Sequence, residues 1–269
     1  PEGMSYNSWL IADSQVAILD TADARLAEEW KRHLTQALAD RQPDYLVVHH
    51  MEPDHASLVA WAMEQYPAMQ IVCSTQAAKM LPQFFEGIKT DGRVRIVKEG
   101  DTLCLGQHTL RFIGAPMVHW PEVLMSYEEK SGTLFSADAF GKFGALQNET
   151  ADWACEARRY YFNICGKYGT QVQNVLKKAT ALCPQAICPL HGPVLRDASL
   201  QQAVSLYGTW SSYQPESEGV LVAYASIHGG TKKATERLAG MLREKGAKKV
   251  VLADLTRSDM AEVIEDAFR

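Results

Sequence analysis

A short segment of the sequence contains four side chains that commonly bind metal ions: His50, Glu52, Asp54 and His55. It follows residues 45–48, whose apolar and β-branched side chains predict a buried strand, and it precedes residues 56–66, which predict a helix. The segment should therefore form a loop at the carboxyl end of a strand, where α/β proteins tend to build their sites. Two imidazoles and two carboxylates so close together would repel or remain unpaired without a cation, so the pattern predicts a metal site.

Three later segments repeat this arrangement, in which a short apolar strand ends beside a metal-binding side chain. These side chains are His119, Asp138 and His191. Four such segments are harder to explain by chance than one, so the predicted site draws on all of them. Three of the eight histidines are interpreted as ordinary polar residues: His33, His49 and His108. His49 should point away from His50, because neighbouring side chains on a strand alternate.

The charges of the seven candidate ligands indicate which metals they suit. They comprise four neutral imidazoles and three carboxylates. Two divalent ions would bring four positive charges, which leaves one for a bridging hydroxide and makes the site nearly neutral. Zinc hydrolases rely more on histidine, whereas a carboxylate-rich set favours iron. Asp138, alone on its loop, is predicted to bridge two metals at a separation of roughly 3.5–4 Å.

The elements that must position these residues can be read from the same chain. Hydrophobic periodicity predicts strands at 5–12, 16–20, 70–73, 133–136 and 186–188, helices at 22–39 and 76–86, a β-rich tract at 94–112, and a helical region at 152–180 interrupted at Gly166 or Gly169. Short strands with interposed helices indicate an α/β protein. Residues 1–213 are predicted to form the metal-binding domain.

A polar segment without periodicity, residues 211–219, is interpreted as an interdomain linker. After it, residues 219–269 begin a second domain with a strand at 220–224, a helix at 232–245 and a strand at 249–253. The loop between the first strand and the helix consists of Ser226, Ile227, His228, Gly229, Gly230 and Thr231. Hydroxyls and glycines at a helix N-terminus favour phosphate binding, although the spacing is not that of a Walker A loop.

Composition excludes several classes of partner. The net charge is -5 and the sequence has no Lys/Arg-rich run, which argues against nucleic acid or an anionic membrane surface. No apolar run approaches the roughly 18 residues of a membrane span. The six cysteines form no C-x-x-C pair, which favours a reduced, cytoplasmic protein.

The sequence resembles the flavodiiron proteins (A-type flavoproteins). The resemblance rests on residues 50–55, 118–121, 135–141, 190–192 and 226–231, which match family motifs in order. It implies a metallo-β-lactamase-like αβ/βα sandwich followed by a flavodoxin-like, doubly wound domain that binds FMN. It also implies that His50, Glu52, His119 and Asp138 bind one iron, and that Asp54, His55, Asp138 and His191 bind the other.

The resemblance further implies an oxidoreductase that reduces dioxygen to water, nitric oxide to nitrous oxide, or both, with electrons delivered through FMN. A rubredoxin or a flavin reductase would donate the electrons, and a head-to-tail homodimer is expected. A doubly wound domain needs about five parallel strands, and only two precede Arg269. The chain is therefore expected to be truncated at both ends, with an incomplete FMN site.

Two alternative functions remain open at this point. A two-zinc hydrolase of the same fold would use similar ligands, but Glu52 stands where such hydrolases usually have histidine. A di-iron oxygen sensor without turnover would need no FMN, and the loop at 226–231 argues against it.

Overall fold

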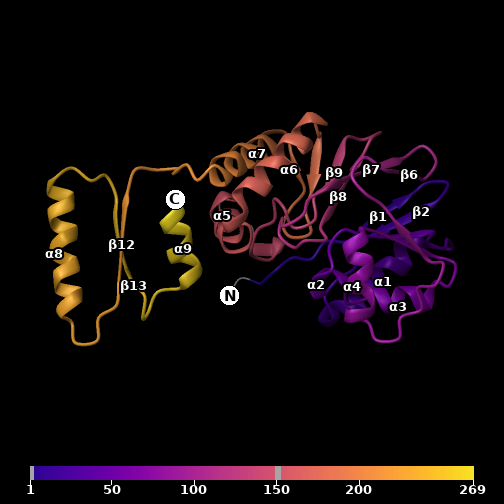
Figure 1. Cartoon of the computed structure of the whole chain (residues 1–269), viewed down its shortest axis with the longest axis horizontal. Coiled ribbons are helices and arrows are strands. Elements are labelled where there is room, and N and C mark those ends of the chain that lie inside the picture. Colours follow the sequence, from indigo (N-terminus) through magenta and orange to yellow (C-terminus); the bar gives the residue numbers. More distant parts are fainter. Residues whose placement is uncertain (1–2, 149–152) are drawn as a thin grey trace.

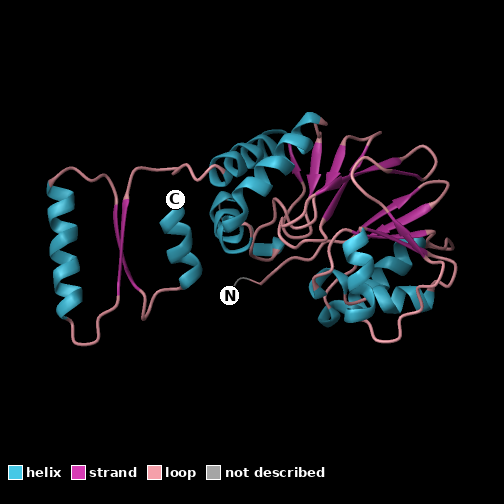
Figure 2. Ribbon diagram, viewed as in Figure 1, coloured by secondary structure: helices cyan, strands magenta, loops and turns pink. Residues whose placement is uncertain are grey.

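The computed structural model describes residues 3–148 and 153–269. Two β-sheets pack face to face and helices cover both outer faces (Figures 1 and 2). The first sheet contains, in spatial order, β1 (Trp9–Ala12), β2 (Val16–Leu19), β3 (Tyr45–Val48), β4 (Gln70–Cys73) and β5 (Val94–Ile96). The second contains β11 (Leu195–Arg196), β10 (Ala186–Cys188), β9 (Thr133–Phe135), β8 (Leu124–Glu128), β7 (Thr109–Gly114) and β6 (Thr102–Cys104).

Each sheet has its own layer of helices. The first layer is α1 (Ala27–Leu38), α2 (Pro53–Ala56), α3 (Val59–Gln65) and α4 (Thr75–Phe84), and the second is α5 (Trp153–Ile164), α6 (Gly169–Ala181) and α7 (Asp197–Ser211). Side chains alternate along β2, so Val16 and Ile18 pack among the helices while Ala17 and Leu19 pack against the second sheet. The αβ/βα sandwich that the resemblance implies is thus confirmed.

Several predicted elements differ from those observed. The strand expected at 5–12 begins only at Trp9, because Ser5 and Asn7 form hydrogen bonds with the loop at 189–192 instead. The helical region expected at 152–180 is interrupted as predicted, by a 3-10 turn at Gly166–Tyr168. Its expected first residue, Asp152, lies outside the described residues.

The remainder of the chain forms a β-α-β unit followed by a helix. Its elements are β12 (Val220–Tyr224), α8 (Gly230–Glu244), β13 (Val250–Asp254) and α9 (Met260–Phe268). β12 and β13 pair in parallel, as expected for the start of a doubly wound domain. α9 lies between this small sheet and α5, and α8 lies on the opposite side of the sheet (Figure 1). In the described part of the chain, no helix has the length and apolar character needed to cross a bilayer.

Candidate metal centre

The segment after β3 positions the first four candidate ligands. His50 is fully buried two residues beyond the end of β3, and Glu52 occupies the N-cap position of α2. Asp54 and His55 lie within the single turn of α2, so the predicted loop is in fact helical from Pro53 onward. The correction has a simple cause, since proline at the first helical position already has the backbone angle that a helix requires.

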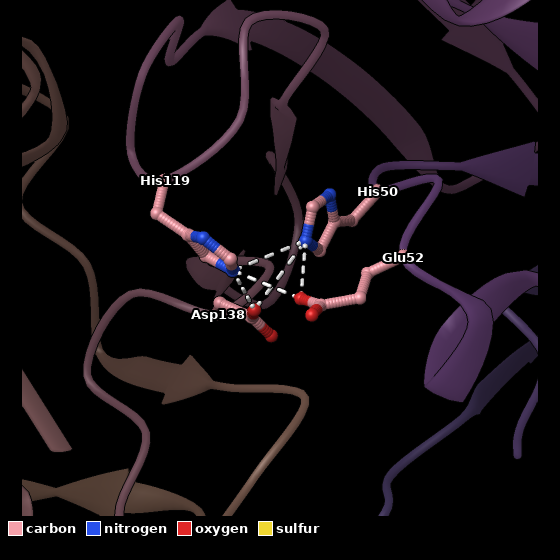
Figure 3. Close-up of side chains that lie close together, drawn as sticks. All are labelled: His50, Glu52, His119 and Asp138. Atoms are coloured by element: carbon pink, nitrogen blue, oxygen red, sulfur yellow. Dashed lines mark hydrogen bonds and ion pairs between the residues drawn. The ribbon is translucent and has the colours of Figure 1, made fainter. Parts of the chain in front are cut away.

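His50, Glu52, His119 and Asp138 form a first cluster (Figure 3). Nε2 of His119 lies 3.0 Å from Oε2 of Glu52, 2.9 Å from Oδ2 of Asp138 and 3.3 Å from Nε2 of His50. Donor atoms that bind one ion at about 2.0–2.2 Å lie about 3 Å apart. The spacing in this cluster therefore fits a single metal ion.

Asp54, His55 and His191 form a second cluster. Their donor atoms have the same spacing, because the Nε2 atoms of the two histidines lie 3.0 Å apart and Oδ2 of Asp54 lies 3.4 Å and 3.3 Å from them. Both imidazoles are buried, whereas the Asp54 side chain is 23% exposed. This second group can also surround one ion.

Asp138 lies between the two clusters. Its Oδ2 atom faces the first cluster, while Oδ1 lies 3.1 Å from Nε2 of His55 and 3.6 Å from Nε2 of His191. Oδ1 is buried and has no hydrogen-bond partner among the described residues. This oxygen and the two imidazole nitrogens therefore converge on a common space. The structure thus brings all seven predicted residues together.

The loop that carries Asp138 is tightly constrained. Ala137 and Phe140 adopt positive φ angles of 50° and 68°, which turn the chain on either side of the aspartate. The hydroxyl of Tyr207, on α7, accepts a hydrogen bond of 2.6 Å from the Phe140 amide, and the two rings stack. These contacts hold the loop against the second helix layer, so they fix the direction of the Asp138 side chain.

The charges in the site favour a cation. Burial alone would lower the pKa of His50, but its hydrogen bonds to Glu122 and Glu52 raise that pKa to about 10. Burial would raise the pKa of Glu52, yet its contacts with His119 and His50 lower it to about 2. The pKa of Asp138 lies well below its ordinary value despite burial, because three imidazoles surround it. Ionised carboxylates and converging imidazoles are a donor set that suits divalent transition metals.

The sequence did not reveal the groups that orient the ligands. Nδ1–H of His50 donates to Oε1 of the fully buried Glu122 at 2.7 Å, and Nδ1–H of His191 donates to the Ser5 carbonyl at 2.7 Å. Each bond leaves Nε2 free to face the site, which is how metal-binding histidines are usually held. Glu122 carries a detectable signal, a carboxylate three residues after His119. The Ser5 carbonyl is a backbone group, so the type of residue at this position gives no indication of the contact.

A cavity of about 380 Å³ opens onto the first cluster. Its lining includes Glu52 and His119 but none of the other five predicted ligands, and the rest comes from Trp120, Phe162, Asn163, Ile164, Gly166, Lys167 and Tyr168. Small molecules can therefore reach the candidate metal centre from the side of Glu52. Glu52 is also the most exposed residue of the first cluster, with 34% of its side chain accessible.

The predicted phosphate loop connects β12 to α8. Gly229 has a φ of 81°, in the left-handed region that favours glycine, and it forms the N-cap of α8. Ser226 Oγ accepts a hydrogen bond of 3.2 Å from the amide of Lys232. Ile227 is 90% exposed and His228 is also exposed. Four of the six predicted residues, Ser226 to Gly229, therefore lie in the connection before α8, whereas Gly230 and Thr231 form the start of the helix, which begins two residues earlier than predicted.

The sandwich, with potential ligands gathered where its strands end, defines a protein of the metallo-β-lactamase-like class. A family model described as "ODP family beta lactamase" matches residues 4–192. The fold is similar to that of rubredoxin oxygen:oxidoreductase from Desulfovibrio gigas, with a TM-score of 0.93 and 27% identity over 100% of this chain and 68% of that one. The flavodiiron protein from Giardia intestinalis aligns with a TM-score of 0.88 and 29% identity, over 98% of this chain and 65% of that one.

Curated relatives point the same way. The anaerobic nitric oxide reductase flavorubredoxin of Escherichia coli is 30% identical over 99% of this chain and 57% of its own length. A putative diflavin flavoprotein of Nostoc is 30% identical over 99% of this chain and 46% of its own length. This chain therefore belongs to the flavodiiron protein family, and it spans about half the length of these two relatives.

Proposed function

We propose that the seven side chains bind two iron ions. His50, Glu52, His119 and Asp138 would hold one ion, and Asp54, His55, Asp138 and His191 the other. The position of Asp138 carries this proposal, because its two oxygens face the two clusters as a bridging carboxylate requires. Three carboxylates among seven ligands favour iron over the more histidine-rich zinc sites.

FMN is the proposed second cofactor, bound through its phosphate by Ser226, Ile227, His228, Gly229, Gly230 and Thr231. The N-terminus of α8 and its helix dipole support this assignment, as does the left-handed Gly229. Lys232 and Lys233 lie in the first turn of the helix and add positive charge. We place the metal-binding domain at 1–213 and the FMN-binding domain at 219–269.

The proposed activity is the reduction of dioxygen to water, of nitric oxide to nitrous oxide, or both. When bound, the irons and FMN supply the redox chemistry that amino-acid side chains lack. The chain's own residues orient the ligands and shape access to them. Phe162 and Ile164 give the cavity beside Glu52 an apolar wall, which suits small uncharged gases.

Names of relatives support the choice of partners. One is a rubredoxin oxygen:oxidoreductase and another a flavorubredoxin, so a rubredoxin is the first candidate donor and a flavin reductase the second. The connection from β12 to α8 lies on the side of the small sheet away from α5 (Figure 1). A head-to-tail homodimer would let the flavin of one copy serve the metal centre of the other. The six free cysteines support a cytoplasmic location.

The main alternative is a two-zinc hydrolase. Glu52 argues against it, because an anionic ligand replaces the histidine that such enzymes usually place there. A di-iron oxygen sensor is the second alternative, and the loop before α8 argues against it, since reversible oxygen binding needs no flavin.

Metal competition combined with activity assays tests the proposal. The protein is refolded or reconstituted anaerobically with equimolar Fe(II) and Zn(II), and its metals, consumption of O2 and NO with a chemical reductant, and ester hydrolysis are measured. We expect iron to dominate in the wild type and zinc to gain in Glu52→His, because a neutral ligand replaces an anion. Preferential uptake of zinc with ester hydrolysis would establish the hydrolase instead. Reversible oxygen binding without consumption would establish the sensor.

A further inference from the structure

Residues 122–126, which lead into and form part of β8, hold the segment that carries His50 through four hydrogen bonds. Glu122 Oε1 accepts from the His50 ring at 2.7 Å and from the Met51 amide at 2.9 Å. The Leu124 amide donates to the His49 carbonyl at 3.0 Å, and Ser126 Oγ lies 2.8 Å from Nε2 of His49. These four hydrogen bonds, which we call the clamp, join the segment after β3 of the first sheet to the segment that enters β8 of the second.

His49 is the side chain that completes this clamp. Its Nδ1–H donates to Oδ2 of Asp20 at 2.6 Å, because a carboxylate at this distance can only accept. Nε2 is then the acceptor of the Ser126 hydroxyl. Oδ1 of Asp20 also accepts from the backbone amides of His49 at 2.8 Å and His50 at 3.3 Å. All three side chains are buried, so water does not compete for these bonds.

The clamp joins two ligand-bearing segments that come from different sheets. His50 and Glu52 follow β3 in the first sheet, whereas His119 lies three residues before Glu122, on the segment that enters the second sheet. The second cluster is held by other groups. Thr21 donates from its amide and its hydroxyl to the His55 carbonyl, and the Ser5 carbonyl accepts from His191.

We infer that His49 is a positioning residue, which sets the separation of His50 and His119 by linking Asp20 to Ser126. This inference rests on the proposed metal-binding function. A purely structural role would affect the stability of the whole domain and both clusters alike. A positioning role affects the first cluster selectively, since only that cluster has ligands on both of the segments that these bonds join, the one after β3 and the one that enters β8.

The test uses two substitutions that break the same bond from opposite ends, Ser126→Ala and His49→Asn. Asparagine can keep the contact with Asp20 but is too short to reach Ser126. Each is combined with His191→Ala, which leaves only the first cluster intact, or with His119→Ala, which leaves only the second. Metal-free proteins are titrated anaerobically with Co(II), followed by its visible absorption, and thermal unfolding of each metal-free protein is recorded. His33→Asn, at an exposed position on α1, is the control.

We expect Ser126→Ala and His49→Asn each to weaken Co(II) binding about tenfold in the His191→Ala background, as loss of an orienting contact typically does. Binding in the His119→Ala background should not change. The double substitution should weaken Co(II) binding no more than either single one, because all three variants lose the same His49–Ser126 bond. Equal weakening in both backgrounds, or none in either, would overturn the positioning role. A wild-type protein that binds no Co(II) at all would instead overturn the proposed function.

Discussion

At the scale of single residues, the proposed metal ligands are oriented by groups that lie outside the two clusters. The sequence predicted all seven ligand candidates because imidazoles and carboxylates at strand ends are recognisable by type and spacing. It did not predict the acceptors behind His50 and His191, which are a carboxylate 72 residues away and a backbone carbonyl 186 residues away. Glu122 can be noticed as a carboxylate near His119, but its pairing with His50 is visible only once the two sheets are packed together.

Glu122 offers a direct test at this scale. Glu122→Gln keeps the shape of the side chain but removes the charge that makes the His50 ring a stronger donor to a metal. We expect the affinity of the first cluster to fall about 10-fold to 100-fold, as measured by anaerobic metal titration. Glu86→Gln, at an exposed position, is the matched control. An unchanged affinity for Glu122→Gln would show that the hydrogen bond is incidental.

At the scale of elements, strands made of a short continuous apolar run were predicted accurately, and β3, β4, β10 and β12 have the expected bounds. β8, α7 and α9 were not predicted. In β8, Ser126 and Glu128 interrupt the apolar run that would indicate a strand, although both side chains are buried. α9 is stabilised by packing, since Phe268 stacks on Phe162 of α5 with ring centroids 4.6 Å apart. Local sequence does not report such a distant partner.

Packing between α6 and α7 gives a prediction at the same scale. A Cβ at Gly169 would overlap the Ser211 carbonyl and lie 2.9 Å from the Tyr213 ring, so Gly169→Ala should destabilise the fold by about 1–3 kcal/mol. Gly208→Ala is the control, because nothing lies within 4 Å of a Cβ there. It should stabilise α7 by about 0.5–1 kcal/mol, since glycine is unfavourable within a helix. Urea unfolding measures both, and equal effects would contradict the packing argument.

At the scale of the whole molecule, one arginine joins the sandwich to the segments that follow it. Arg158 on α5 binds Glu216 through two hydrogen bonds and Glu265 on α9 through a third of 2.9 Å. Trp210 also donates to Glu216. Glu216 and Glu265 lie 58 and 107 residues from Arg158 along the chain. This separation explains why the sequence indicated a linker but not the contact that orders it.

This contact predicts a dependence of stability on pH. Burial would raise the pKa of Glu216, but its hydrogen bonds to Arg158 and Trp210 lower it below the ordinary value of 4.5. A carboxyl with a depressed folded-state pKa stabilises the fold above about pH 4.5 and loses that contribution as the pH falls through the folded value. The thermal midpoint should therefore drop more steeply on acidification in the wild type than in Glu216→Gln. Glu218→Gln, whose side chain is 78% exposed, should behave like the wild type. Identical acid profiles for Glu216→Gln and the wild type would show that the Glu216 carboxylate does not contribute to this pH dependence.

The measurement that tests the central claim most directly is the magnetic coupling of bound iron, because coupling requires a shared bridge. The metal-free protein is reconstituted anaerobically with Fe(II), and metal content and Mössbauer and EPR spectra are recorded for the wild type and for Asp138→Ala. We predict two coupled irons per wild-type chain and loss of that coupled pair in Asp138→Ala, with Asp40→Asn at an exposed turn as the unaffected control. A wild-type protein with a single iron, or with two irons that do not interact, would contradict the assignment of Asp138 as the bridge between the two clusters.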